Sequence, residues 1–110
     1  MITRTAVFEG RVTPGHEEAF FGAVESRLAP MWAAFPHARN VRWHRITEAD
    51  PESPPVAMIQ QVDYPSRAAL AQAIASPQRD AARALTLELA KMFEGRFYHY
   101  ISGSDEPEAA

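Results

Sequence analysis

The sequence contains no cysteine, which excludes disulfide bonds, cysteine metal ligands and thiol nucleophiles. It has no apolar run near the roughly 18 residues of a membrane-spanning helix, so we expect no membrane partner. The first residues lack the apolar segment of a signal peptide, and a cytoplasmic location is the default expectation. Basic residues are not in excess, because 11 of them stand against 14 acidic residues. This balance argues against nucleic acid as a partner.

Motifs for nucleotide binding and for nucleophilic catalysis are also missing. The sequence has no P-loop, no G-x-G-x-x-G loop and no G-x-S-x-G nucleophile elbow. Its four histidines do not have the i, i+4 or i, i+2 spacing of a metal-ligand pair. We therefore expect neither a bound metal nor an organic cofactor.

The 110 residues alternate between strand and helix patterns within the length of one domain. Period-two alternation predicts strands at 4–12, 40–47, 56–64 and 97–101. Helical spacing predicts a helix that starts at Thr13 as N-cap and is interrupted at Pro30. Two further helices are predicted, capped by Ser66 and Ser76, with the second ending at 94 before Gly95 as the C′ residue. We expect one domain over 1–101 and a disordered acidic tail over 102–110.

This order, β-α-β-β-α-β, predicts a ferredoxin-like α+β fold. Four strands would form one antiparallel sheet with the helices on one face. The other face would carry a partly apolar surface that needs a cover, and a second copy of the same sheet is the simplest one. We therefore expect a homodimer through the sheet face, a barrel whose outer-face residues include Val7, Ala57, Ile59, Tyr98 and Tyr100.

Two segments resemble the dimeric α+β barrel superfamily. Residues 12–20, VTPGHEEAF, resemble its V-x-P-G-x-E-x-x-F strand-to-helix turn, and residues 61–70, QVDYPSRAAL, followed by Ser76-Pro77, resemble a second segment. The layout is most similar to the antibiotic biosynthesis monooxygenase-like and EthD-like branches. Members often carry histidine just after the Ser-Pro turn, where this chain has Gln78 and Arg79. The Asn, Trp and His set of the haem-degrading branch has no counterpart here.

The resemblance implies three functional alternatives. The first is a cofactor-independent monooxygenase that acts on a phenolic or quinol-like, apolar aromatic small molecule. The second is a non-catalytic, EthD-like binding or accessory protein. The third is a lyase or isomerase on the same scaffold. In the family, the ligand pocket is the space between the sheet and the helices.

His99 is the candidate catalytic base, because it shares a strand face with Phe97 and an imidazole exchanges protons near neutral pH. A core histidine bonded to a backbone carbonyl is the alternative. Trp32 and Tyr64 are candidates for orienting a substrate ring, since each has an apolar body and a polar tip. Met58 and Phe97 complete the substrate-binding set. These residue types also build ordinary cores, and that alternative stays open here.

Charged residues on 40–47 predict an edge strand rather than a binding site. Arg42 and Arg45 lie on opposite faces of that strand, so they cannot form one clamp for an anion. His44 and His99 are expected on opposite edges of the sheet, which argues against a metal site shared between them.

Overall fold

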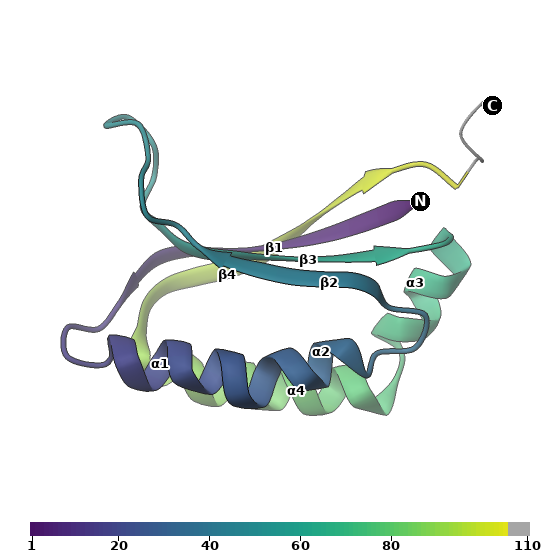
Figure 1. Ribbon diagram of the computed structural model, residues 1–110, viewed down its shortest axis with the longest axis horizontal. Coiled ribbons are helices and arrows are strands. Elements are labelled where there is room, and N and C mark those ends of the chain that lie inside the picture. The colour runs from purple at the N-terminus through teal and green to yellow at the C-terminus, as the bar shows by residue number, and fades with distance from the viewer. Residues whose placement is uncertain (106–110) are drawn as a thin grey trace.

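The computed structural model describes residues 1–105 and shows a two-layer α+β arrangement, with one four-stranded sheet covered on one face by helices (Figure 1). The sheet order is β2-β3-β1-β4 and all neighbouring strands are antiparallel. This confirms the predicted ferredoxin-like fold. The elements in chain order are β1 (Ile2–Val12), α1 (Glu17–Ala23), η1 (Val24–Leu28), α2 (Ala29–Ala33), β2 (Arg39–Arg45), β3 (Val56–Tyr64), α3 (Arg67–Ile74), α4 (Pro77–Leu89), η2 (Ala90–Met92) and β4 (Phe93–Gly103).

The first helix starts later than predicted, because α1 begins at Glu17 rather than after Thr13. The Thr13 N–H donates to the carbonyl of Met92 (2.9 Å), and the His16 N–H donates to the carbonyl of Thr13 (3.0 Å). Gly15 between them has a φ of 87°, a left-handed conformation that a helix cannot contain. Residues 13–16 therefore form a turn, and the prediction of Thr13 as N-cap is wrong.

The first helical region is interrupted near Pro30, as predicted, and the interruption is a π-helical segment. Residues Val24–Leu28 form a π-helical segment before α2, in which the Ala29 N–H donates to the carbonyl of Val24 five residues earlier. Proline has no N–H, and its ring collides with the carbonyl four residues before it in an α-helix. The wider π turn places that carbonyl elsewhere, so the chain continues past Pro30.

The second helical region confirms both predicted caps. The Ala69 N–H donates to Ser66 Oγ (3.1 Å), and the Arg79 N–H donates to Ser76 Oγ (3.2 Å). Each hydroxyl satisfies a backbone donor that has no partner within its helix. The two serines thereby set where α3 and α4 begin, and the start of α4 determines which of its residues face the sheet.

The end of this region differs from the prediction, because α4 stops at Leu89 and β4 starts at Phe93. Gly95 is therefore a strand residue rather than a helix C′ residue. It lies opposite Gly10 in β1, and both have positive φ values, 130° for Gly10 and 153° for Gly95. A Cβ on Gly95 would overlap the carbonyl oxygen of Glu9. The close approach of the two strands, rather than a helix end, explains this glycine.

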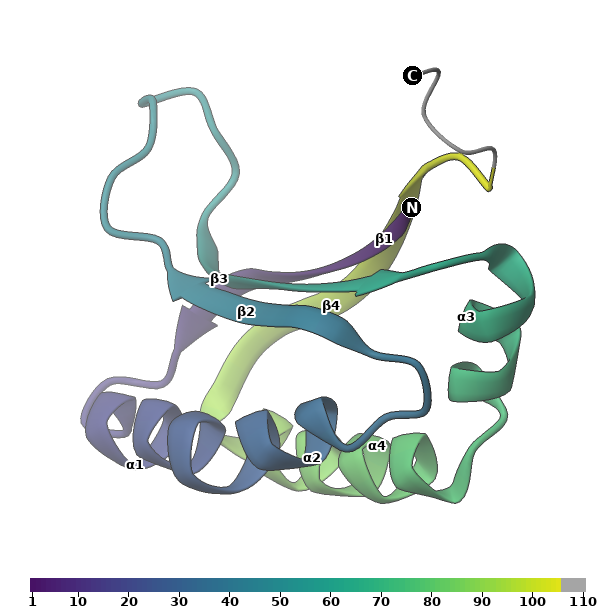
Figure 2. The ribbon, with the colours of Figure 1, turned by 45° about the vertical axis from the view of Figure 1, so that its right-hand side comes forward.

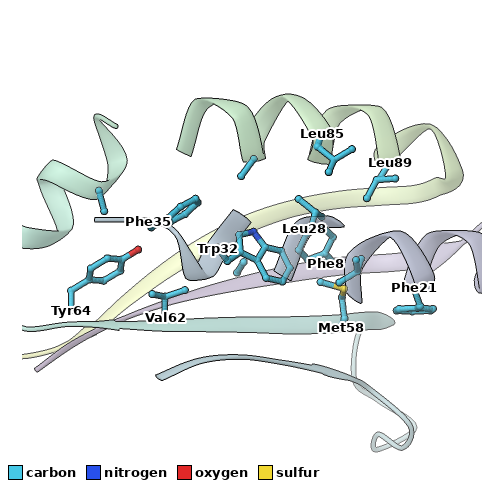
Figure 3. Packing of buried hydrophobic residues seen from close by; sticks show 14 of the residues in the cluster. Phe8, Phe21, Leu28, Trp32, Phe35, Met58, Val62, Tyr64, Leu85 and Leu89 are labelled. Carbon is cyan, nitrogen blue, oxygen red and sulfur yellow. The ribbon is translucent and has the colours of Figure 1, made fainter. Parts of the chain in front are cut away.

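The core fills the space between the sheet and the helices (Figure 3). Alternation along β1 and β3 turns Phe8, Met58 and Val62 toward the helices, which contribute Phe20, Leu28 and Leu85 among others. The aromatic side chains stack, with the rings of Phe8 and Phe97 5.5 Å apart. These contacts bury the apolar faces of both layers, which is the main source of stability in such a fold.

The opposite, outer face of the sheet bears no helix (Figures 1 and 2). The β2–β3 loop rises on this side, away from the helices (Figure 2). Strand β2 is one edge of the sheet, as its charged residues predicted, and β4 is the other edge. Strand β4 continues to Gly103, beyond the predicted domain end at 101. Residues 106–110 of the predicted tail lie outside the described part of the chain.

Candidate functional site

A cavity of about 50 Å³ lies between the sheet and helices α2 and α4. Its walls combine aromatic rings with cationic side chains. The lining residues come from β1, β3, β4, α4 and the segment of α2 with its following turn: Arg4, Ala6, Phe8, Trp32, Phe35, Gln60, Arg79, Ala82, Arg83, Thr86, Phe97 and His99.

Three neighbouring strands form the floor of the cavity. Ala6 of β1 lies opposite Gln60 of β3 on one side and opposite His99 of β4 on the other. All three side chains point toward the helices, because residues in register share a face. The small side chain of Ala6 leaves space between the two polar groups. A row of alternating polar and small residues thus makes the cavity and gives it two hydrogen-bonding groups.

Helix α4 forms the opposite wall. Arg79, Ala82, Arg83 and Thr86 are spaced by three and four residues, which places them on one face of the helix. The Thr86 hydroxyl donates to the carbonyl of Ala82 (2.8 Å), so it is occupied within the helix. Arg79 and Arg83 therefore supply the polar groups of this wall.

Three arginines and no acidic residue line the cavity. Burial lowers the pKa of Arg4, the charge of Arg79 acts in the same direction, and Tyr64 acts in the opposite direction. Arg79 lowers the pKa of Arg4 because the two positive charges lie near each other in the partly desolvated cavity. Arg79 has one weak ion pair, 3.9 Å from Asp80, whose side chain is 71% exposed. The cavity is therefore electropositive.

His99 is neutral in this environment. Burial lowers its pKa to about 4, and the charges of Arg4, Arg79 and Arg83 act in the same direction. The residue is nonetheless exposed to solvent, because it lies on the edge strand β4. No hydrogen bond joins its ring to any of residues 1–105, so it is not a core histidine fixed to a backbone carbonyl. An uncharged imidazole can accept a proton or a hydrogen bond from a ligand.

The structure brings three of the predicted site residues to the cavity, namely Trp32, Phe97 and His99. Met58 and Tyr64 do not line it. Met58 is 0% exposed and Tyr64 is 1% exposed, and both pack in the core (Figure 3). Burial raises the pKa of Tyr64, and the nearby charge of Arg4 opposes this effect.

Sequence reasoning missed the cationic residues of the cavity and Gln60. A signal for Arg4 existed, since it shares the core-facing side of its strand with Ala6 and Phe8. Gln60 likewise alternates with buried apolar residues in β3. The i, i+4 spacing of Arg79 and Arg83 was also visible, but many exposed helix faces show the same spacing.

The arginines of β2, by contrast, have partners outside the cavity. Arg42 pairs with Asp63 at 3.3 Å, and the guanidinium of Arg45 lies 4.0 Å from the ring centre of Phe21. This confirms that they do not form one clamp, since their strand positions face opposite sides of the sheet. His44 lies opposite Ile59 on the outer face, far from the position of His99 in the strand order.

No group of three or more histidine, aspartate or glutamate side chains within residues 1–105 could hold a metal ion. No helix in the same range has both the length and the apolar character needed to cross a membrane.

Comparison with known proteins places the fold. No protein-family model and no curated protein sequence matches the chain. An EthD family protein from Bacillus halodurans has a similar structure, with a TM-score of 0.77 and 18% identity over 94% of this chain and 98% of that chain. An antibiotic biosynthesis monooxygenase has a TM-score of 0.62 and 13% identity over 94% and 98%. A dimeric ferredoxin-like protein of unknown function from Thermobifida fusca has a TM-score of 0.63 and 16% identity over 92% and 88%.

These structures represent both branches that the two sequence segments resemble, and each aligns over nearly the whole of this chain. At such low identity they establish the fold and not the activity. The chain therefore has a ferredoxin-like α+β fold, which it shares with these three structures.

Proposed function

We propose that the protein is a cofactor-independent monooxygenase that acts on a phenolic or quinol-like small molecule. The observation that carries this proposal is a neutral His99 facing a cavity with aromatic walls and three guanidinium groups. Such a site can remove a proton from a phenolic hydroxyl and stabilise the anion that remains. The deprotonated substrate itself then reacts with dioxygen, so the protein supplies a base, orientation and desolvation.

The positive charges act on both partners of this proton transfer. They lower the pKa of His99, which weakens it as a base in the empty site. They equally lower the pKa of a hydroxyl bound beside them, because the anion is stabilised by the same field. The proton moves from the substrate oxygen to the imidazole, and the new anion in turn stabilises the imidazolium. Trp32 and Phe97 provide apolar surface for the ring.

The size of the cavity limits how the substrate enters. A cavity of roughly 150 Å³ holds a benzene ring, whereas this one measures about 50 Å³. Arg83 is exposed and the Arg79 side chain is 25% exposed, so both can move outward without disturbing the core. We expect the ring to displace these two side chains while its hydroxyl reaches His99.

We also propose that the protein is a homodimer through the outer face of the sheet. This face presents Val7, Ile59 and Tyr100, and Tyr100 is 61% exposed. Several of its polar groups are already joined across strands: Thr3 to Asp63, Gln61 to Thr5, and Tyr98 to Glu9. A second copy can cover such a surface without leaving these groups unsatisfied. The Thermobifida fusca protein of similar fold is described as dimeric, in line with this proposal.

The same cavity supports a second candidate, a protein that binds a small molecule without converting it. The low pKa of His99 favours this alternative, because a base with a pKa of about 4 holds a proton weakly at neutral pH. The two candidates share the ligand site and differ only in turnover.

Oxygen consumption decides between them. Purified protein is supplied with a panel of quinols and phenols in an oxygen-electrode cell, with His99→Ala as the test variant and His16→Ala as its control. His16 is exposed and its side chain does not cap α1. We expect uptake by the wild type and by His16→Ala, and a loss of about 100-fold or more for His99→Ala. Binding without uptake would favour the non-catalytic candidate, and unchanged uptake by His99→Ala would remove His99 from the mechanism.

A further inference from the structure

We infer that the cavity holds its ligand through a carboxylate, bound by Arg79 and Arg83 of α4 together with Arg4 of β1. This names the substrate class, an aromatic or otherwise apolar carboxylic acid, and it rests on the proposed ligand site rather than on the proposed oxidation. In the proposed reaction, the carboxylate anchors the substrate and its hydroxyl lies at His99.

The positive charge of the cavity is not balanced by acidic side chains within residues 1–105. Arg4 and Arg83 have no ion-pair partner within the described residues, and Arg79 reaches only the exposed Asp80 at 3.9 Å. The other polar lining groups carry no negative charge: Gln60 and His99 are neutral, and the Thr86 hydroxyl is bonded within its helix. Within residues 1–105 no acidic side chain lines the cavity, so an anionic ligand can supply the balancing charge.

Three arginines outside the cavity have a partner side chain within the described residues. Arg42 is 3.3 Å from Asp63, and Arg96 is 3.3 Å from Glu9. Arg45 lies over the ring of Phe21. No such ion pair forms at Arg4 or Arg83 within residues 1–105, so both can bind an acidic group of a ligand.

The shape and the walls of the cavity favour a carboxylate over inorganic phosphate. A carboxylate is planar and accepts two parallel bonds from one guanidinium, and its other side is an organic body. Much of the remaining wall is apolar, formed by Phe8, Phe35 and Phe97 among others, and suits an organic body better than the further oxygens of a phosphate. The ring then lies against Trp32 and Phe97, and its carboxylate meets Arg79 and Arg83, which move outward to admit the ring.

The test is calorimetric titration of the full-length wild type with benzoate, with benzamide as its uncharged analogue and with inorganic phosphate. We expect saturable benzoate binding at least about tenfold tighter than that of benzamide or phosphate. We further expect Arg79→Met and Arg83→Met to weaken benzoate binding at least about tenfold. The control Arg27→Met removes the same charge from an exposed position in η1 that does not line the cavity, and it should bind benzoate like the wild type.

A second readout follows His99 by NMR, because a carboxylate among the arginines offsets their charge and raises the pKa of the ring. Equal affinity for benzamide, equal affinity for phosphate, or no binding of benzoate would each overturn the inference. These three outcomes are measured on the wild type alone, so they do not depend on whether the variants fold. Benzoate binding without oxygen uptake on hydroxybenzoates would leave the inference standing and defeat the proposed oxidation alone.

Discussion

His99 connects the protonation of the cavity to the stability of the protein. Its pKa is about 4 in the folded chain and 6.5 in an unstructured one. Between these values the unfolded chain binds a proton at His99 that the folded chain does not bind. The free energy of unfolding therefore falls as the pH falls from 6.5 to 4, and the contribution of His99 is constant above and below this window.

We expect this loss to reach about 1 kcal/mol, well below the energy that the full pKa shift would give, because His99 is exposed and solvent screens its charge. Urea unfolding of the wild type and of His99→Gln at several pH values measures it. Carboxylates also titrate in this range, so the difference between the two proteins is the quantity to compare. An NMR titration that placed the pKa of His99 at or above 6.5 would contradict the prediction.

At this scale the sequence was informative for residues whose position follows from alternation alone. Phe97 and His99 share a strand face with period two, and the structure places both at the cavity. Arg79 and Arg83 reach it only because α4 packs over the β1–β4 half of the sheet, which no local pattern specifies. Tyr64 was predicted to line the pocket because it has a polar tip, but the structure buries the whole side chain in the core.

At the scale of elements, the pairing of β1 with β4 depends on Gly10 and Gly95. We expect Gly10→Ala to lower the free energy of unfolding by about 3 kcal/mol or more, because a Cβ there collides with the backbone of Glu94 at an unfavourable φ. Gly22→Ala is the matched control, since a Cβ at Gly22 in α1 meets no atom. It should stabilise the protein by about 0.5–1 kcal/mol. Chemical denaturation measures both changes, and similar values for the two variants would refute the close-approach argument.

The same pair of glycines explains why one element boundary was wrong in the sequence interpretation. A glycine after a helical run is typical of a helix end, and Gly95 follows such a run. Its partner Gly10 lies 85 positions earlier in the chain, so the contact that requires both glycines is visible only in the fold. The serine caps were predicted correctly because their hydrogen bonds are local, each reaching a backbone N–H three residues on.

At the scale of the whole molecule, the bare sheet face is the feature that sequence and structure share. Alternation predicted which residues would lie on it, and the strand register places Val7, Ile59 and Tyr98 there. What the alternation did not show is that several polar neighbours on this face are hydrogen-bonded across strands. Polar groups that are bonded to one another keep their hydrogen bonds when a second protein copy covers them. Polar groups that are bonded only to water would lose theirs.

The proposed dimer predicts that a charge on this face separates the subunits. A two-fold interface contains every substitution twice, so Tyr100→Glu would bury two carboxylates where two aromatic rings packed. We expect its dimer dissociation constant to rise at least about tenfold, while circular dichroism of the variant stays that of the wild type. Leu87→Glu is the control, because Leu87 is an exposed apolar residue, 49% accessible, on α4 and away from the bare face. Light scattering over a dilution series measures the association of all three proteins. A monomeric wild type, or a Tyr100→Glu variant that associates as strongly as Leu87→Glu, would show that this face is not the interface.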